Sequence, residues 1–224
     1  MTDDKGSRNL CIFSFDIGVN NMGFACISIG PLLPHVVVHK LDRRALPIAS
    51  SSSSSAKKIS PIDLIDGVRK YVTEIARSVD AKFIETDTML VPDIVYIEQQ
   101  VVMSKFGTNY DALKIQTILH TLYRERYPHC TVEIVGASAR DSGGTKARAH
   151  AVSVELLLCY SSSWLNEMMK MKVADTQHIH DAVSMIIKKQ GYYYMPDVER
   201  HMKDWDALNP VEKKTRGKKK SADE

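Results

Sequence analysis

A buried strand that carries one carboxylate is the feature that most constrains how this chain folds. Residues 12–17 read Ile-Phe-Ser-Phe-Asp-Ile, and a turn through Gly18 and Asn20-Asn21 leads into a second apolar run that starts at Met22. An Asp inside an apolar strand costs free energy unless something compensates its charge. A divalent metal ion is one such partner, and a tight turn that Asp16 caps through the backbone is the alternative. The segment therefore predicts a hairpin with Asp16 at a special position.

The composition is that of one globular domain. The 224 residues are 44% hydrophobic and 25% charged, which is ordinary for a chain with a single sizeable core. No apolar run approaches the roughly 20 residues of a membrane-spanning helix, and the first residues lack the pattern of a secretory signal. Four scattered cysteines without Cys-x-x-Cys spacing suggest neither a zinc site nor a disulfide framework. We therefore expect no membrane and an intracellular, reducing compartment.

The order of expected elements indicates an α/β fold. Apolar runs with turn signals between them predict strands, and apolar residues at helical spacing predict helices. Strands are expected at 10–18, 22–30, 35–39, 93–98 and 131–135, and helices from 61 to about 79, over 108–126 and 146–160, and from about 178 to 187. Ser60 and Pro61 suit the cap and first position of the first helix, and residues 161–163 read as a polar loop. The pattern predicts an antiparallel meander that continues into a mixed sheet with helices on both faces.

The expected domain spans residues 10–195, contains one insertion and has a tail on each side. Residues 1–9 form an N-terminal tail, and 48–60 form a loop insertion around six consecutive serines. Residues 196–224 form a basic tail with a run of lysines, which is expected to be disordered and to add DNA affinity or serve nuclear import.

Two further carboxylates sit at the ends of expected elements. Glu98 ends the strand at 93–98, and Asp181 opens the last helix with His178 one turn before it. Residues three apart share a helix face, so His178 and Asp181 can point to one place. Carboxylates from two strands and a helix can bracket two Mg²⁺ ions, or Mn²⁺ ions, and such a pair promotes phosphodiester hydrolysis. The alternative is that the three carboxylates have separate roles: Asp16 as a turn residue, Glu98 as a surface residue at a strand end and Asp181 as a charge favoured at a helix N-terminus.

Three patches of this sequence resemble the RuvC-type Holliday junction resolvases, most of all those of poxviruses and related large DNA viruses. They are Ser14–Phe24, Ile97-Glu98-Gln99 and Asp181-Ala182, and the likeness spans about residues 10–190 with the serine run as an insertion. The resemblance implies an RNase H-like fold with three antiparallel strands followed by two parallel ones. It also implies a homodimer, Mg²⁺-dependent symmetric nicking of four-way DNA junctions and, for a viral chain, the host cytoplasm or nucleus. By matching position, Asp16, Glu98 and Asp181 would be catalytic metal ligands.

One position departs from the family pattern. The family usually has two acidic residues three apart at the last helix, and here the first of them is His178. A neutral imidazole ligates Mn²⁺ well and Mg²⁺ less readily, and it can also accept a proton from water. His178 is therefore a candidate metal ligand and catalytic residue, and Asp175 is the alternative ligand.

Basic residues after the catalytic strands are candidates for DNA contact. Lys146, at a helix start, resembles a family lysine near the scissile phosphate, where it would stabilise charge in the transition state. Candidates for DNA binding are Lys105, Phe106, Arg140 and Arg148, with the aromatic ring stacking on opened bases. The alternative for the basic residues is that they are solvated surface cations without a role in DNA binding, and the alternative for Phe106 is that its ring is buried under its loop.

The expected function is a metal-dependent, structure-selective endonuclease that resolves Holliday junctions by paired symmetric nicking. An actin-like ATPase would also open with Asp16-Ile17-Gly18, but no second glycine-rich phosphate loop is evident, so no nucleotide cofactor is expected. A non-catalytic branched-DNA-binding protein of the same fold and an RNA–DNA hybrid nuclease remain as alternatives.

Overall fold

A five-stranded mixed sheet with helices on both faces is the frame of the molecule. The computed structural model describes residues 9–30, 36–48, 59–80, 90–100, 109–136 and 145–190. The strands are β1 (Leu10–Asp16), β2 (Met22–Ile29), β3 (Val36–Arg44), β4 (Ile94–Glu98) and β5 (Thr131–Val135). The helices are α1 (Pro61–Asp80), α2 (Tyr110–Arg126), α3 (Thr145–Tyr160), α4 (Ser162–Met169) and α5 (Val173–Lys189).

The sheet has the strand order β3-β2-β1-β4-β5. β1, β2 and β3 are antiparallel neighbours, whereas β1, β4 and β5 run parallel. The order confirms the predicted RNase H-like arrangement of three antiparallel strands followed by two parallel ones. It places β1, the strand with Asp16, in the centre of the sheet.

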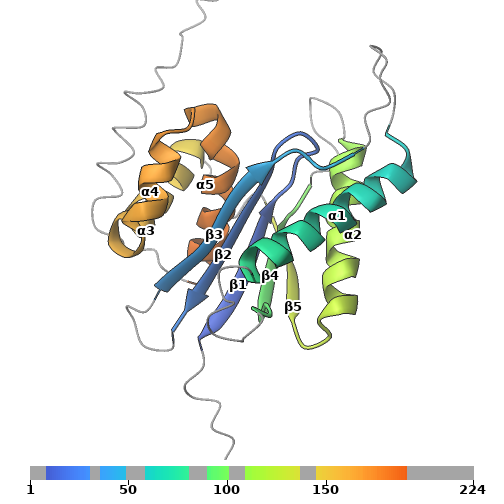
Figure 1. The fold of residues 1–224 in the computed structure, drawn as a ribbon, viewed down its shortest axis with the longest axis horizontal. Helices are drawn as coiled ribbons and strands as arrows, with labels where there is room; N and C mark the ends of the chain where they lie inside the picture. The colour runs from blue at the N-terminus through green and yellow to red at the C-terminus, as the bar shows by residue number, and fades with distance from the viewer. Residues whose placement is uncertain are drawn as a thin grey trace, which may run out of the picture.

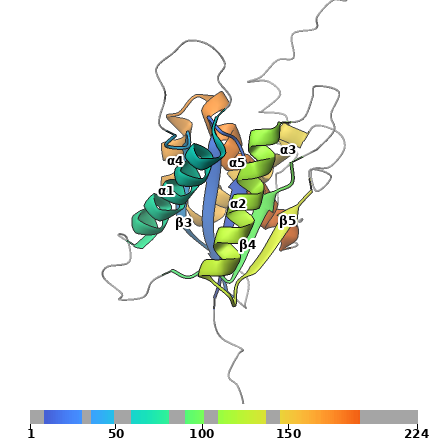
Figure 2. The ribbon, with the colours of Figure 1, turned by 90° about the vertical axis from the view of Figure 1, so that its right-hand side faces the viewer.

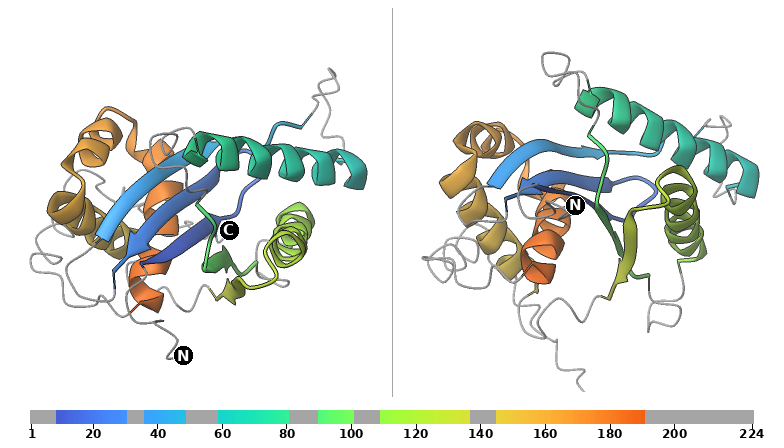
Figure 3. Two further views of the ribbon diagram at one scale, coloured as in Figure 1. Left: turned by 60° about the horizontal axis from the view of Figure 1, so that its bottom comes forward. Right: turned by 90° about the horizontal axis from the view of Figure 1, so that it is seen from below.

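The helices form one layer on each face of this sheet. α1 and α2 cover one face, and α3, α4 and α5 cover the other (Figures 1 and 3). Figure 2 shows α1 and α2 side by side on their face. Because both faces are covered, β1 is buried from Cys11 to Asp16 and β2 over its whole length, as expected for central strands of such a sheet.

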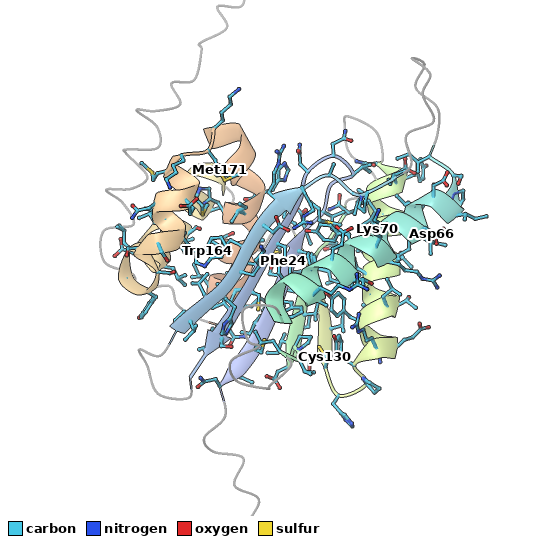
Figure 4. The ribbon with its side chains drawn as sticks, in the orientation of Figure 1. Phe24, Asp66, Lys70, Cys130, Trp164 and Met171 are labelled. Atoms are coloured by element: carbon cyan, nitrogen blue, oxygen red, sulfur yellow. The ribbon has the colours of Figure 1, made fainter. Side chains whose placement is uncertain are left out.

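Alternation along β1 divides the core into two parts. Phe13 and Phe15 pack with Phe24 and Tyr123 under α1 and α2, with ring centroids 5.0–6.1 Å apart. Ile12 belongs to the second cluster, under α3, α4 and α5. Figure 4 labels Phe24 on the sheet. The face toward α5 therefore also receives Asp16, four residues after Ile12.

The predicted start of α1 is confirmed in detail. The Ser60 hydroxyl accepts a hydrogen bond from the Asp63 backbone N–H at 3.1 Å, and Pro61 is the first helical residue. Val68, Val72 and Ile75 are buried as the helical spacing predicts, but Ile62 is 70% exposed. Asp66 and Lys70 point outward from the helix (Figure 4).

Three predicted boundaries were wrong. β3 continues to Arg44 instead of ending at 39, because its charged second half still pairs with β2, from Lys40 opposite Cys26 to Arg44 opposite Met22. Residues 161–163 were expected to form a polar loop, but helix α4 begins at Ser162, since Trp164, Leu165 and Met168 pack at helical spacing against the core (Trp164 in Figure 4). α5 begins at Val173 instead of near 178, so Asp175 lies in its first turn and Asp181 lies mid-helix.

Parts of the predicted segments fall outside the described residues. They are 1–8 of the N-terminal tail, 49–58 of the serine-rich loop and the whole tail at 196–224. Among the helices that the structure describes, none has both the length and the apolar character to cross a membrane.

Candidate active site

Asp16 and Glu98 end two neighbouring parallel strands at the same edge of the sheet. Phe15 of β1 pairs with Ile97 of β4, so the next residues, Asp16 and Glu98, lie at one level, about 4.8 Å apart in backbone spacing. Alternation turns both side chains toward α5, because Ile12 and Tyr96 of the same strands pack on that face. Both are buried, with exposed fractions of 3% and 8%. Two carboxylates thus share one buried edge.

A glycine on the adjacent strand lets α5 lie against this edge. Gly23 of β2 pairs with Asp16, and a Cβ at position 23 would lie 2.1 Å from the backbone oxygen of His178. No side chain fits there, so the helix backbone rests directly on the strand. His178 Nδ1 consequently contacts Asp16 Oδ2.

Asp181 and Glu98 each accept a hydrogen bond from a glutamine side chain. Gln177 Nε2 donates to Asp181 Oδ1 at 3.1 Å within α5, where both side chains are buried. Gln100 Nε2 donates to Glu98 Oε2 at 3.1 Å, and the Ile17 backbone N–H donates to the same oxygen at 3.2 Å. Donors of this kind favour the charged form of a carboxylate without cancelling its charge.

The two histidines of α5 have different environments. His178 faces Asp16, whereas His180 packs edge-on against His150 of α3 with ring centroids 4.5 Å apart. Burial, aided by His150, lowers the pKa of His180 to about 3. His180 is therefore neutral at physiological pH and belongs to the α3–α5 interface.

The donor types at this edge suit a hard divalent cation. Carboxylate oxygens are the ligands that Mg²⁺ prefers, and an imidazole nitrogen is acceptable to Mn²⁺. Within the described part of the chain, however, no group of three or more His, Cys, Asp or Glu side chains is arranged to hold one ion. Asp16 contacts His178, Glu98 contacts Gln100, and Asp181 contacts Gln177. The residue types fit the predicted metal, and the metal centre itself stays a prediction.

The other predicted site residues are described only in part. Lys105, Phe106 and Arg140 lie outside the described residues. Lys146 and Arg148 lie in the first turn of α3, and Asp175 lies in that of α5, with only the backbone described. Their predicted roles therefore remain predictions.

Sequence reasoning missed three polar side chains near the edge. In extended backbone, residues two apart point the same way, and this would have singled out Gln100 for Glu98. Gln177 lies four residues before Asp181, which is helical spacing, but the helix was expected to begin later. Arg43 pairs with Gly23, and its guanidinium donates to Asn21 Oδ1; the third strand was expected to end before it.

Comparisons with known proteins identify the fold. No family model matches this sequence, and no curated protein matches it either. The fowlpox virus Holliday junction resolvase is 14% identical, with a TM-score of 0.50 over 81% of this chain and 99% of that one. Thermus thermophilus RuvC in complex with a Holliday junction substrate is 11% identical, with a TM-score of 0.50 over 82% and 94%. The yeast mitochondrial Holliday junction resolvase Ydc2 is 14% identical, with a TM-score of 0.50 over 88% and 82%. The chain thus has the fold of the RuvC-type resolvases.

Proposed function

We propose that this protein is a divalent-metal-dependent endonuclease that resolves four-way DNA junctions by paired symmetric nicks. The observation that carries the proposal is the burial of Asp16, Glu98 and Asp181 on elements that meet at one edge of the sheet. Buried carboxylates are rare unless paired or bound to a metal. The fold supports the same function, because its solved neighbours are named as Holliday junction resolvases.

The chain's own residues would divide the work in the following way. Asp16, Glu98 and Asp181 would supply oxygen ligands for Mg²⁺ or Mn²⁺, and two bound ions would neutralise phosphate charge and lower the pKa of a water molecule. His178 directs Nδ1 to Asp16. In the neutral tautomer that carries its proton on Nδ1 and donates it to Asp16, the other ring nitrogen, Nε2, can accept a proton or bind a metal.

Binding of branched DNA belongs to the same proposal. Lys146 and Arg148 lie in the first turn of α3, and in the sequence Lys105 and Phe106 follow β4 and Arg140 follows β5. Cations and an aromatic residue in these positions suit contacts with phosphates and unpaired bases. Two nicks placed symmetrically on a junction require two equivalent sites, which a homodimer supplies.

The test is cleavage of a synthetic four-way junction by the wild-type chain and by Asp16→Asn, with Mg²⁺ and Mn²⁺ in separate titrations. We expect Asp16→Asn to lose nicking with both ions while its junction affinity stays within a few-fold of wild type. Asp66→Asn, an exposed position on α1, is the matched control and should cleave normally. Linear duplex and RNA–DNA hybrid serve as competing substrates. Equal cleavage by Asp16→Asn, or preference for the hybrid, would contradict the proposal.

A second candidate is a junction-binding protein that does not cut. The observation that favours it is that the described carboxylates pair with His178, Gln100 and Gln177 instead of forming a three-ligand cluster. Tight junction binding by the wild-type chain with no nick under either ion would select this candidate.

A further inference from the structure

Glu98 is joined to helix α2 through a chain of amide hydrogen bonds. Gln116, buried on α2, accepts the Gln100 backbone N–H on its Oε1 at 2.6 Å. The Gln100 side chain then donates from Nε2 to Glu98 Oε2 at 3.1 Å. The same carboxylate oxygen accepts the N–H of Ile17, the residue after Asp16, at 3.2 Å. The series connects α2, the end of β4 and the end of β1.

The two adjacent glutamines have different roles in this arrangement. Gln99 continues the sheet, since its backbone N–H donates to Val135 of β5 at 2.8 Å and its side chain is exposed. Gln100 is half-buried and its side chain turns back to Glu98. The family resemblance includes Gln99 in its Ile-Glu-Gln patch, whereas the hydrogen bonds involve Gln100.

A neutral amide is well suited to orient a ligand carboxylate. It restricts the rotamers of the acid and favours its charged form, and it leaves the negative charge that attracts a cation. A Lys or Arg in its place would neutralise that charge. Outer partners of this kind typically change metal affinity by about 10- to 100-fold when they are removed. Gln177 makes the same kind of bond to Asp181.

We propose that Gln100, held by Gln116, is the positioning residue that fixes Glu98 and thereby sets the affinity of this edge for divalent cations. The inference rests on the proposed function, because Glu98 matters here as a cation ligand. Gln116 contributes by fixing the backbone from which Gln100 reaches the carboxylate. Gln99 does not contribute to the positioning of Glu98 in this proposal.

The experiment compares Gln100→Ala with Gln99→Ala in the full-length chain, with Mn²⁺ as the probe. Free Mn²⁺ is measured by electron paramagnetic resonance during titration, which needs no substrate and no turnover. We expect Gln100→Ala to weaken Mn²⁺ binding about tenfold or more and Gln99→Ala to bind like wild type. Gln116→Met, which removes the acceptor at similar size, should give a smaller loss in the same direction.

Cleavage provides a second readout that a merely structural role would not reproduce. The Mn²⁺ concentration for half-maximal nicking should rise in Gln100→Ala by the same factor as the dissociation constant. Saturating Mn²⁺ should then restore its single-turnover rate to near the wild-type value, with metal-free junction affinity and melting temperature unchanged.

The outcomes separate this inference from the proposed function. If Gln100→Ala and Gln99→Ala bind Mn²⁺ equally, the positioning role is wrong although the nuclease proposal stands. If the wild-type chain binds no more Mn²⁺ than Asp16→Asn does and leaves the junction uncut, the nuclease proposal fails and the positioning role fails with it.

Discussion

Gly23 determines how closely helix α5 approaches Asp16. The glycine pairs with Asp16 on one side and with Arg43 on the other, and the His178 carbonyl lies where its side chain would be. Any larger residue must push α5 outward. His178 and Asp181 belong to that helix, so their position relative to the carboxylates of the sheet depends on the absence of a Cβ atom at position 23.

Gly23→Ala should therefore separate helix from sheet. The new Cβ would lie 2.1 Å from backbone that cannot rotate away, and overpacking of this kind typically costs about 1–3 kcal/mol. We expect a lower free energy of unfolding in urea and a loss of both Mn²⁺ binding and nicking. The matched control is Gly67→Ala on α1, whose Cβ would meet the Ile48 side chain at 2.9 Å and backbone only at 3.7 Å, at the Pro47 oxygen. Gly67→Ala should lose less stability than Gly23→Ala, because a side chain can shift where backbone cannot and because Ala is the better helix former. Equal stability of the two variants would contradict this account of Gly23.

Single residues also show what the sequence could and could not reveal. Asp16 and Glu98 were found because a charge inside an apolar strand or at its end is conspicuous in the sequence. Gly23 was assigned no role from the sequence, since its role depends on a helix more than 150 positions later. Gln100 was passed over for Gln99, because the side-chain direction beyond the end of β4 had not been followed.

At the level of elements, one face of α5 contacts the candidate active site and another face packs in the core. His178 contacts Asp16, whereas His180, two residues later, is buried against His150 of α3. Two residues along a helix turn the side chain by about 200°, which explains the opposite environments. The helix therefore couples the packing of α3 to the placement of the site.

The buried His180 makes the packing of α3 on α5 sensitive to acid. Its pKa falls to about 3 in the folded chain, from an ordinary value of about 6.5. Between these values the unfolded chain binds one more proton at this residue, so the stabilisation is complete above about pH 6.5 and is lost as the pH falls toward 3. Free energies of unfolding measured in urea from pH 4 to 8 should thus rise more steeply with pH in wild type than in His180→Leu. Parallel slopes in wild type and His180→Leu would refute the assignment.

Element types were easier to predict than element ends. The five strands followed from apolar runs with turn signals between them, and the family resemblance implied three antiparallel strands followed by two parallel ones, but three boundaries moved. α4 was missed because polar residues around 161–163 precede the apolar positions that pack at helical spacing, and the start of α5 was missed because residues 172–178 are mostly polar. The late start assigned to α5 hid the bond from Gln177 to Asp181. Register was beyond sequence reasoning, since it depends on which residues meet across strands.

For the molecule as a whole, one row of residues crosses the sheet at the edge where the carboxylates lie. The row runs from Glu98 through Asp16 and Gly23 to Arg43, all on the face that α5 covers. The anionic end would attract cations, and the cationic end lies two strands away from Asp16. Arg44, the next residue, faces α1 instead and is paired with Asp42 and Glu74. The two adjacent arginines therefore differ in the face that they serve.

DNA that reaches the site across this edge would meet Arg43 before Arg44. The Arg43 guanidinium donates a hydrogen bond to Asn21 in the turn between β1 and β2, at the end of the row opposite Glu98. We expect Arg43→Ala to weaken junction binding several-fold and to reduce the slope of log affinity against log salt by about one contact, close to 0.9. Arg44→Ala should keep both the affinity and the slope, because its partners are acidic side chains on the opposite face. Filter-binding or fluorescence titrations from 50 to 200 mM salt, with metal omitted to prevent cleavage, measure both quantities. Equal effects of the two substitutions would mean that the row across the sheet does not mark the path of the DNA.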